Sequence, residues 1–381
     1  MKPYESPWMD DDLRMLREAI SRYVEAEMLP LDAKWRADQR VDKESWRRIG
    51  AAGFLLMDVP AEYGGGGGDF RHETLLYEEL NRRGISGFGQ GVHSISAHYV
   101  LNYGTEEQKQ RWLPRMARGE LIGAIAMTEP GAGSDLKGIR TRAVREGGEY
   151  VINGSKIFIT NGSIATILML VVRTDPNDRS RGLSILMVET GSLPGYRVGR
   201  VLDKMGMTAQ DTSELFFEDV RVPADCLLGG EEGRGMHMLM GDLPYERLTI
   251  ALGGVAAMEG AYEETVRYTR ERQAFGHKIG EFQNTRFKLA EVATHVRVAR
   301  VFVDRCIEQL VKGELDTETA AMAKWWITDI QQKVIDECVQ LFGGYGYMNE
   351  YLVCRMFADS RVQRIYGGTN EIMKELISRS I

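Results

Sequence analysis

The chain has 381 residues, of which 43% are hydrophobic and 27% charged, and its formal net charge is −7. This length allows two or three domains with a substantial buried core, and the composition is that of an ordinary globular protein. The acidic balance argues against a protein that binds nucleic acid or anionic membranes through its overall charge. The four cysteines lie far apart without metal-ligand spacing, so we expect a reducing compartment and no metal site.

The first residues of the chain are acidic and contain no apolar stretch of the kind that a secretory signal needs. They also lack the arginine-rich, acid-poor character of a transit peptide. No apolar run approaches the roughly 20 residues of a membrane span. We therefore expect a cytoplasmic protein of bacterial type without a membrane span; an organellar protein trimmed of its leader is the alternative.

The first part of the chain has the pattern of helices. Apolar residues recur at helical spacing from Leu13 to Val24, and Pro30 is expected to end that run. Two further helical patterns follow at residues 44–52 and 73–83. The run of five glycines between these two patterns predicts a loop, because it does not lie at the strand–helix junction that a phosphate-binding loop requires.

The middle of the chain has strand patterns instead. Residues 149–160 form two β-rich runs around an Asn-Gly pair, which predicts a β-hairpin. Runs dense in Ile, Leu, Met and Val at 167–174 and 183–190 predict strands buried on both faces, and 214–220 predicts one more. Because the strands do not alternate with helices and no Gly-x-Gly-x-x-Gly motif follows one, a Rossmann dinucleotide site is disfavoured.

The last part returns to helix, in three long amphipathic stretches: one around Val255, one from Phe287 to Cys306 and one from Met322 to Val334. Long helices with short connections are typical of an antiparallel bundle. The predicted fold class is therefore α+β with three domains. These are an N-terminal α-helical domain at 1–120, a central all-β domain at 121–230 and a C-terminal antiparallel four-helix bundle at 231–381.

The segment 127–135, Met-Thr-Glu-Pro-Gly-Ala-Gly-Ser-Asp, resembles the Thr-Glu-Pro-x-x-Gly-Ser-Asp signature of the acyl-CoA dehydrogenase family. Other stretches similar to the family stand in the family's order over essentially the whole chain, at 103–109, 112–114, 156–162, 272–276, 340–346 and 365–371. The resemblance implies the family's three-domain fold and a FAD-dependent dehydrogenase of fatty or branched acyl-CoA. It also implies a homotetramer, a dimer of dimers, that passes electrons to an electron-transferring flavoprotein.

The same resemblance implies which residues bind FAD. Those at the flavin ring would be Met127, Thr128, Phe158, Ile159 and Thr160, with Phe158 in place of the tryptophan of many relatives. Those that reach the diphosphate and adenosine part of a neighbouring subunit's FAD would be Arg272, Phe275, Gln283, Gln340, Leu341, Gly343 and Gly344. Those that close over the adenine side of the subunit's own FAD would be Thr369, Asn370 and Glu371.

The resemblance also implies contacts with the acyl-CoA substrate. Ser134 would lie near the CoA pyrophosphate, at the edge of the cofactor segment, and a turn beside Asp135 is the alternative interpretation of this serine. The other substrate-binding residues would be Tyr245, Arg247, Tyr366, Gly367 and Gly368. The backbone N–H of Gly367 would help to hold the thioester carbonyl, whereas Arg247 can also be purely structural.

Dehydrogenation of a thioester needs a desolvated carboxylate beside the α-carbon, because the α-proton is weakly acidic. Many acyl-CoA dehydrogenases carry it in a Tyr-Glu-Gly-Thr segment near the C-terminus, where this chain has glycine at position 367. The long-chain and isovaleryl-type enzymes place it in a Glu-Arg pair early in the C-terminal domain, and this chain has Glu246-Arg247 there. We therefore predict Glu246 as the catalytic base, with the small residue at 367 leaving it room; a glutamate that only stabilises a helix dipole is the alternative.

Three other functions stay open at this point. One is an oxidase or monooxygenase of the same fold, in which oxygen meets the reduced flavin. The second is a dehydrogenase of a carrier-protein thioester. The third is a catalytically silent flavin- or CoA-binding subunit of a hetero-oligomer. The length and branching of the acyl chain do not follow from the sequence.

Overall fold

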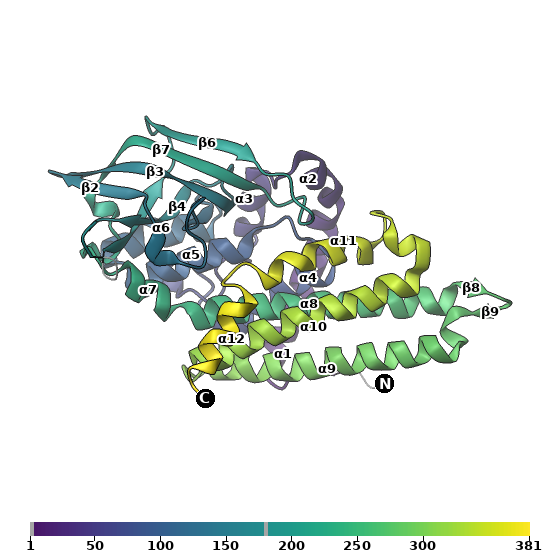
Figure 1. Cartoon of the computed structure of the whole chain (residues 1–381). Helices are drawn as coiled ribbons and strands as arrows, with labels where there is room; N and C mark the ends of the chain where they lie inside the picture. Colours follow the sequence, from purple (N-terminus) through teal and green to yellow (C-terminus); the bar gives the residue numbers. More distant parts are fainter. Residues whose placement is uncertain (1–3, 179–181) are drawn as a thin grey trace.

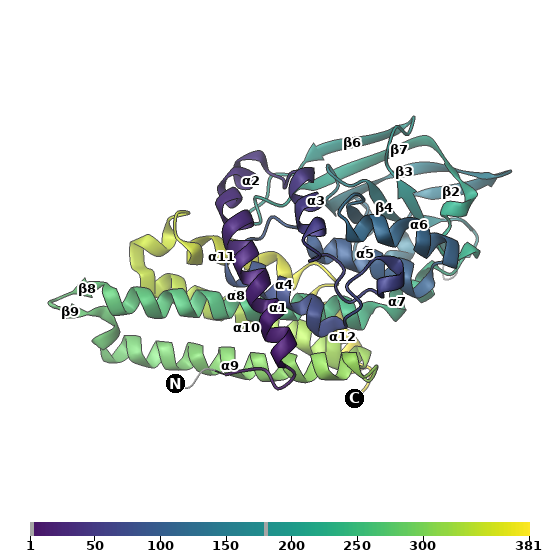
Figure 2. The same ribbon diagram turned by 180° about the vertical axis from the view of Figure 1, so that it is seen from behind.

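The structure is a computed structural model that describes residues 4–178 and 182–381. It has the three-domain fold that the sequence predicts: a helical N-terminal domain, a β-domain and a C-terminal domain of long helices (Figure 1). Seen from behind, the N-terminal helices lie between the sheet and the C-terminal helices (Figure 2). The boundaries at 120 and 230 stay predictions. None of the described helices is long and apolar enough to cross a membrane.

The N-terminal domain is a cluster of helices, three of which begin after a capping aspartate. Its α-helices are α1 (Asp11–Tyr23), α2 (Asp32–Asp38), α3 (Lys43–Ala51), α4 (Phe70–Arg82), α5 (Gln90–Tyr103) and α6 (Glu106–Ala117). Asp10 and Asp42 precede α1 and α3, and each side chain accepts a hydrogen bond from a backbone N–H of the first turn. The prediction that Pro30 ends the first run is wrong. A π-helical turn and a 3-10 turn (Leu29–Leu31) carry the chain into α2, with the proline at a position that needs no N–H.

The β-domain is one mixed sheet. Its strands are β1 (Gly123–Ala126), β2 (Arg142–Glu146), β3 (Glu149–Thr160), β4 (Ile167–Arg173), β5 (Leu183–Glu189), β6 (Tyr196–Val201) and β7 (Thr212–Pro223). The strand order is β1-β4-β2-β3-β7-β6, and β5 pairs with β4. Strands β4 and β5 are buried along almost their whole length, as their apolar runs predict.

The predicted hairpin at 149–160 is wrong. These residues form the single long strand β3, and the tight turn lies before it, between β2 and β3, where Gly147 has φ +62°. The Asn-Gly pair instead marks a bulge in the pairing of β3 with β7. Gly154 has φ +151°, and a Cβ there would lie 2.5 Å from Oγ1 of Thr141. This glycine therefore allows close packing against a neighbouring segment and makes no turn.

The C-terminal domain is built on three long helices that lie side by side in Figure 1, α8, α9 and α10, and the shorter α11 and α12 pack on α10. The bounds are α7 (Gly235–Gly241), α8 (Leu243–Glu271), α9 (Gln283–Val311), α10 (Thr317–Phe342), α11 (Leu352–Ser360) and α12 (Asn370–Ser378). A small hairpin, β8 (Gln273–Ala274) and β9 (His277–Lys278), joins α8 to α9. Phe287 and Met322, assigned to buried faces by their spacing, are 59% and 38% exposed.

Candidate active site

The first turn of α8 is held against the end of α5, where the N-terminal and C-terminal domains meet. Pro244 stands at the start of α8, where its missing N–H leaves no hydrogen bond unmade. The hydroxyl of Tyr99 donates to Oε1 of Glu246 over 2.8 Å. The side-chain amide of Asn102 donates to Oδ1 of Asp242 over 2.8 Å. Two carboxylates one helical turn apart are therefore each tied to α5.

The carboxyl of Glu246 is prepared to accept a proton near neutral pH. Burial raises its pKa to about 7, and the nearby charge of Asp242 acts in the same direction. The hydrogen bond from Tyr99 and the charge of Arg247 oppose this rise. The side chain is only half-buried, so substrate and solvent can reach it. These are the properties expected of a general base in a desolvated site.

Gly367 packs against the side of α8 that carries Glu246. Its φ is +62°, and a Cβ on it would lie 2.2 Å from Cδ1 of Ile250. Ile250 stands one helical turn after Glu246, so both side chains project from the same face of α8. The tail turn at Gly367 therefore packs closely against the helix that carries Glu246.

The tail turn is fixed from behind by a buried lysine. Nζ of Lys324 donates to the carbonyl oxygen of Gly368 over 2.8 Å and to Oδ1 of Asn370 over 2.9 Å. The hydroxyl of Thr369 accepts from a backbone N–H in the first turn of α12. The side chain of Asn370 is therefore occupied inside the C-terminal domain, whereas Glu371 is exposed. Of the three residues predicted for the adenine side, Glu371 is exposed, Thr369 is half-buried and Asn370 is buried.

Replacement of Gly367 by alanine is expected to lower the free energy of unfolding by about 3 kcal/mol and to reduce turnover. The left-handed backbone accounts for about 1 kcal/mol of this loss, and overpacking against Ile250 for the rest. The measurement is urea unfolding of the purified variant. Gly313→Ala is the matched control, because Gly313 has φ +70° and a Cβ there meets nothing within 4 Å. Equal losses in the two variants would contradict the close packing at Gly367.

The predicted flavin-ring residues come from two segments that the structure brings together. The backbone N–H of Ile157 donates to the carbonyl oxygen of Thr128 over 2.9 Å. Nζ of Lys156 donates to the carbonyl oxygen of Met127 over 3.0 Å and to Oε1 of Glu129 over 2.9 Å. This buried ion pair and the backbone contact join the segment after β1 to the end of β3.

Phe158 has the placement that a flat ring partner needs. The pairing of β3 with β7 shifts register between Lys156 and Ile159, and Phe158 within that bulge has φ +61°. The phenyl ring is 62% exposed, whereas Ile159 beside it is buried. Backbone strain that presents an exposed aromatic side chain is typical of a binding site. The segment therefore fits an aromatic group such as a flavin ring, with Thr160 half-buried at its edge.

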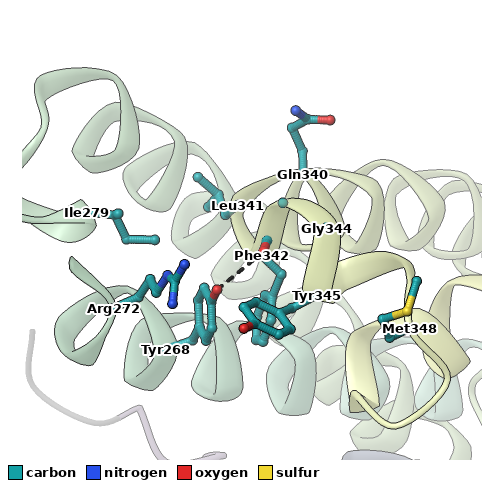
Figure 3. Close-up of a pocket in the computed structure, with 10 residues that line it drawn as sticks. Tyr268, Arg272, Ile279, Gln340, Leu341, Phe342, Gly344, Tyr345 and Met348 are labelled. Atoms are coloured by element: carbon teal, nitrogen blue, oxygen red, sulfur yellow. Dashed lines mark hydrogen bonds between the residues drawn. The ribbon is translucent and has the colours of Figure 1, made fainter. Parts of the chain in front are cut away.

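A cavity of about 550 Å³ lies at the far end of the C-terminal domain (Figure 3). It is lined by Tyr268, Arg272, Ile279, Gln340, Leu341, Phe342, Gly343, Gly344, Tyr345 and Met348. The structure thus gathers Arg272 with the four predicted residues of the segment at 340–344. A Cβ on Gly343 or Gly344 would meet nothing within 4 Å, so the backbone there is open to a ligand. A guanidinium beside a backbone that a ligand can approach closely fits a diphosphate, although the N–H of Gly343 itself donates to the carbonyl oxygen of Gln340.

The structure does not bring all predicted FAD residues into one place. Phe275 is 94% exposed in the β8–β9 hairpin, and Gln283 begins α9 next to it. This end of the C-terminal domain is remote from the sheet that carries Phe158 (Figure 1). Arg272 and its neighbours therefore do not form a single site with Phe158 within one chain, and their action on a neighbouring subunit's cofactor stays a prediction.

The predicted substrate residues differ in their surroundings. Ser134 is exposed in the loop after β1, and Tyr366 is 37% exposed. Tyr245 is buried, and its hydroxyl donates to Oδ2 of Asp58 over 3.2 Å, so it faces the N-terminal domain. Arg247 is 3% exposed, and its Nε and Nη1 have no hydrogen-bond partner among the described residues. A buried guanidinium beside the base contributes charge to the site even without a direct contact.

Four residues of the site were not found from the sequence: Tyr99, Lys156, Asp242 and Lys324. Lys156 lies inside a stretch similar to the family, and a lysine within a predicted strand was the only feature of the sequence that could have marked it. The other three gave none, because their roles depend on partners far away in the chain. The site combines a carboxylate with a raised pKa, an exposed aromatic side chain and a pocket that fits a diphosphate. This combination is typical of a flavoprotein oxidoreductase.

Comparison with known proteins agrees with this class. The chain matches the N-terminal domain of acyl-CoA dehydrogenase at residues 10–120, its middle domain at 124–220 and its C-terminal domain at 233–381. It is 46% identical over 370 residues to the mitochondrial long-chain specific acyl-CoA dehydrogenase of Mus musculus, covering 96% of this chain and 86% of that protein. It is 33% identical over 384 residues to the mitochondrial isovaleryl-CoA dehydrogenase of Pongo abelii, covering 98% and 89%.

Among solved structures, an acyl-CoA dehydrogenase from Geobacillus kaustophilus superposes with a TM-score of 0.96 at 45% identity, covering 99% of each chain. The chain therefore belongs to the acyl-CoA dehydrogenase family, whose members are oxidoreductases that act on acyl-CoA and use FAD. The predicted family and three-domain fold are confirmed.

Proposed function

We propose that this chain is a FAD-dependent acyl-CoA dehydrogenase in which Glu246 removes the α-proton of a fatty or branched acyl-CoA, with formation of the trans-2-enoyl thioester. The observation that carries the proposal is the pairing of Glu246 with Gly367. A half-buried carboxylate with a raised pKa stands on α8, and Gly367, which has no side chain, packs on Ile250 one turn along the same face of that helix. A catalytic base on α8 and a small residue at 367 make one consistent arrangement.

The residues around Glu246 have distinct roles in this reaction. The backbone N–H of Gly367, in a turn fixed by Lys324, would hold the thioester carbonyl and so increase the acidity of the α-carbon. Arg247 stabilises the ionised base by its charge. Tyr366, half-exposed beside the tail turn, would line the acyl chain. These groups bind and orient the thioester so that the α-proton faces the free oxygen of Glu246.

The residues at the two FAD regions fit the cofactor. Phe158 and Thr160 would hold the ring beside the substrate, and Arg272 with the backbone at 343–344 would hold the diphosphate of a neighbouring subunit's FAD in a homotetramer. When bound, the flavin supplies an acceptor for the β-hydrogen as hydride. We propose an electron-transferring flavoprotein as the partner that takes up the electrons afterwards.

The proposal is tested with the purified chain. We expect yellow protein that loses its flavin absorbance when acyl-CoA is added without oxygen, and a series of acyl chain lengths identifies the substrate. Reoxidation is then compared between air and an electron-transferring flavoprotein, and the reaction is repeated with an acyl carrier-protein thioester. Flavin-free protein, or flavin that no thioester bleaches, would contradict the proposal. Rapid reoxidation by air would favour an oxidase.

A further inference from the structure

A tyrosine contacts the base directly. Tyr99 lies on the last turn of α5, is fully buried, and donates its hydroxyl to Oε1 of Glu246 over 2.8 Å. Oε2 of the same carboxylate makes no hydrogen bond to any residue that the structure describes. A carboxylate that is held by one oxygen keeps the other free for a proton. The contact therefore separates the two oxygens of Glu246 into a fixed one and a reactive one.

The turn of α5 that carries Tyr99 is itself anchored to α8 on both sides. Asn102, three residues later, donates to Asp242, and His98, one residue earlier, stacks on Tyr245 with ring centroids 4.1 Å apart. The imidazole of His98 also pairs with Asp58 over 3.0 Å, and Asp58 accepts the hydroxyl of Tyr245. Three residues at the start of α8, Asp242, Tyr245 and Glu246, are thus each contacted by a residue of α5, so the hydroxyl of Tyr99 has little freedom to leave the carboxylate.

We infer that Tyr99 is the positioning residue of the base: its hydroxyl holds Oε1 of Glu246 and leaves Oε2 to meet the α-proton. The inference rests on the proposed function, because it assigns Tyr99 a role through Glu246. A tyrosine hydroxyl suits this role since it donates strongly to a carboxylate and, when buried, stays protonated over the working pH range. Tyr99 itself touches neither substrate nor cofactor in this scheme.

The charges around the carboxylate decide how the role is tested. A hydrogen bond to the ionised form of Glu246 lowers its pKa, whereas the negative charge of Asp242 raises it. Removal of the Tyr99 hydroxyl must therefore raise the pKa of Glu246, and removal of the Asp242 charge must lower it. The titratable and charged groups that face Glu246 or its neighbour Arg247 are Tyr99 and Tyr103 from α5, Arg247 from α8 and Asp242 at the N-cap of that helix, and Lys324 and Glu318 from α10.

The test is Tyr99→Phe, which removes one oxygen and keeps the ring. Because the base must be ionised, kcat/KM falls as the pH drops through its pKa. We expect the acidic limb of kcat/KM in Tyr99→Phe to move up by about one pH unit, and kcat at pH 7 to fall roughly five- to tenfold with KM within about twofold. Tyr103→Phe is the matched control, because its ring packs on Tyr99 with centroids 5.9 Å apart and donates no hydrogen bond to Glu246.

Asp242→Asn supplies the opposite shift. It removes a negative charge near Glu246 and keeps a side chain that Asn102 can contact, so the acidic limb is expected to move down by about half a pH unit. General damage to the first turn of α8 does not produce shifts of opposite sign in the two variants. An acidic limb in Tyr99→Phe that coincides with the limb of Tyr103→Phe overturns the inference.

A second readout serves if Tyr99→Phe loses its flavin. The carboxyl band of Glu246, assigned by its loss in Glu246→Gln, is followed by infrared titration of the flavin-free protein, and its midpoint is expected about one pH unit higher in Tyr99→Phe. A midpoint unchanged by this substitution overturns the inference. Full activity of Glu246→Gln would instead overturn the proposed function. An inactive Glu246→Gln with an unshifted Tyr99→Phe would remove only the role of Tyr99.

Discussion

Replacement of Glu246 by glutamine is expected to lower kcat about 10³-fold while acyl-CoA still binds. A positioned general base contributes roughly 10²–10⁴-fold, and an amide oxygen is far too weak a base to replace a carboxylate. Glutamine preserves the volume of the side chain and can still accept the hydroxyl of Tyr99, so the fold is retained. The measurements are the rate of anaerobic flavin bleaching and the spectral change on substrate binding.

The matched control is Glu263→Gln on the same helix. Glu263 has a 58% exposed side chain and pairs with Arg82, so its replacement is expected to leave turnover within about twofold. In the unaltered protein, kcat/KM is expected to be lost toward acid with a midpoint near the pKa of Glu246, about 7, because the base is protonated below it. The residual activity of Glu246→Gln should lack this limb. Bleaching at the normal rate in Glu246→Gln would reject the assignment.

The parts of the fold that sequence predicted well depend on local patterns. The apolar runs at 167–174 and 183–190 became β4 and β5 because a strand buried on both faces needs continuous hydrophobic residues. The hairpin predicted from the Asn-Gly pair was wrong because non-local strand pairing decides the structure there. The turn preference of the pair is local, whereas pairing with both β2 and β7 stabilises β3 as one strand. Gly154 is then required by its contact with Thr141, which no pattern within the strand contains.

The residues of the candidate site also fall into those that the sequence predicts and those that only the tertiary structure reveals. Glu246 and Gly367 could be predicted as a pair. Glycine at 367 replaces the glutamate of the family's usual tail segment, and the Glu-Arg pair at 246–247 supplies a carboxylate elsewhere. Tyr99 could not be predicted, since it lies 147 residues before Glu246 and nothing in its own neighbourhood marks it. Lys324 is 44 residues from the carbonyl oxygen that it holds. The partner of a buried polar side chain is decided by the tertiary fold, so such residues follow only from coordinates.

Replacement of Lys156 by methionine is expected to lower the free energy of unfolding by about 3–5 kcal/mol and to release the flavin. Lys156 is 1% exposed and Glu129 is 8% exposed, and removal of one partner leaves an uncompensated buried charge. Burial already lowers the pKa of Lys156 to about 8, with the charge of Glu129 opposing that shift. The measurements are urea unfolding and the ratio of flavin to protein absorbance after gel filtration.

The double variant Lys156→Met with Glu129→Gln decides whether charge or shape is responsible. Oε1 and Oε2 of Glu129 also accept the backbone N–H groups of Thr141 and Arg140, at 2.9 and 2.7 Å, and one glutamine oxygen can keep only part of this pattern. We therefore expect recovery of about half of the lost stability, because the unpaired charge is gone while some acceptors are lost. Lys288→Met, at a partly exposed ion pair with Glu337, should leave the unfolding midpoint unchanged. No recovery in the double variant would mean that the methylene packing of Lys156, and not its charge, joins the two flavin segments.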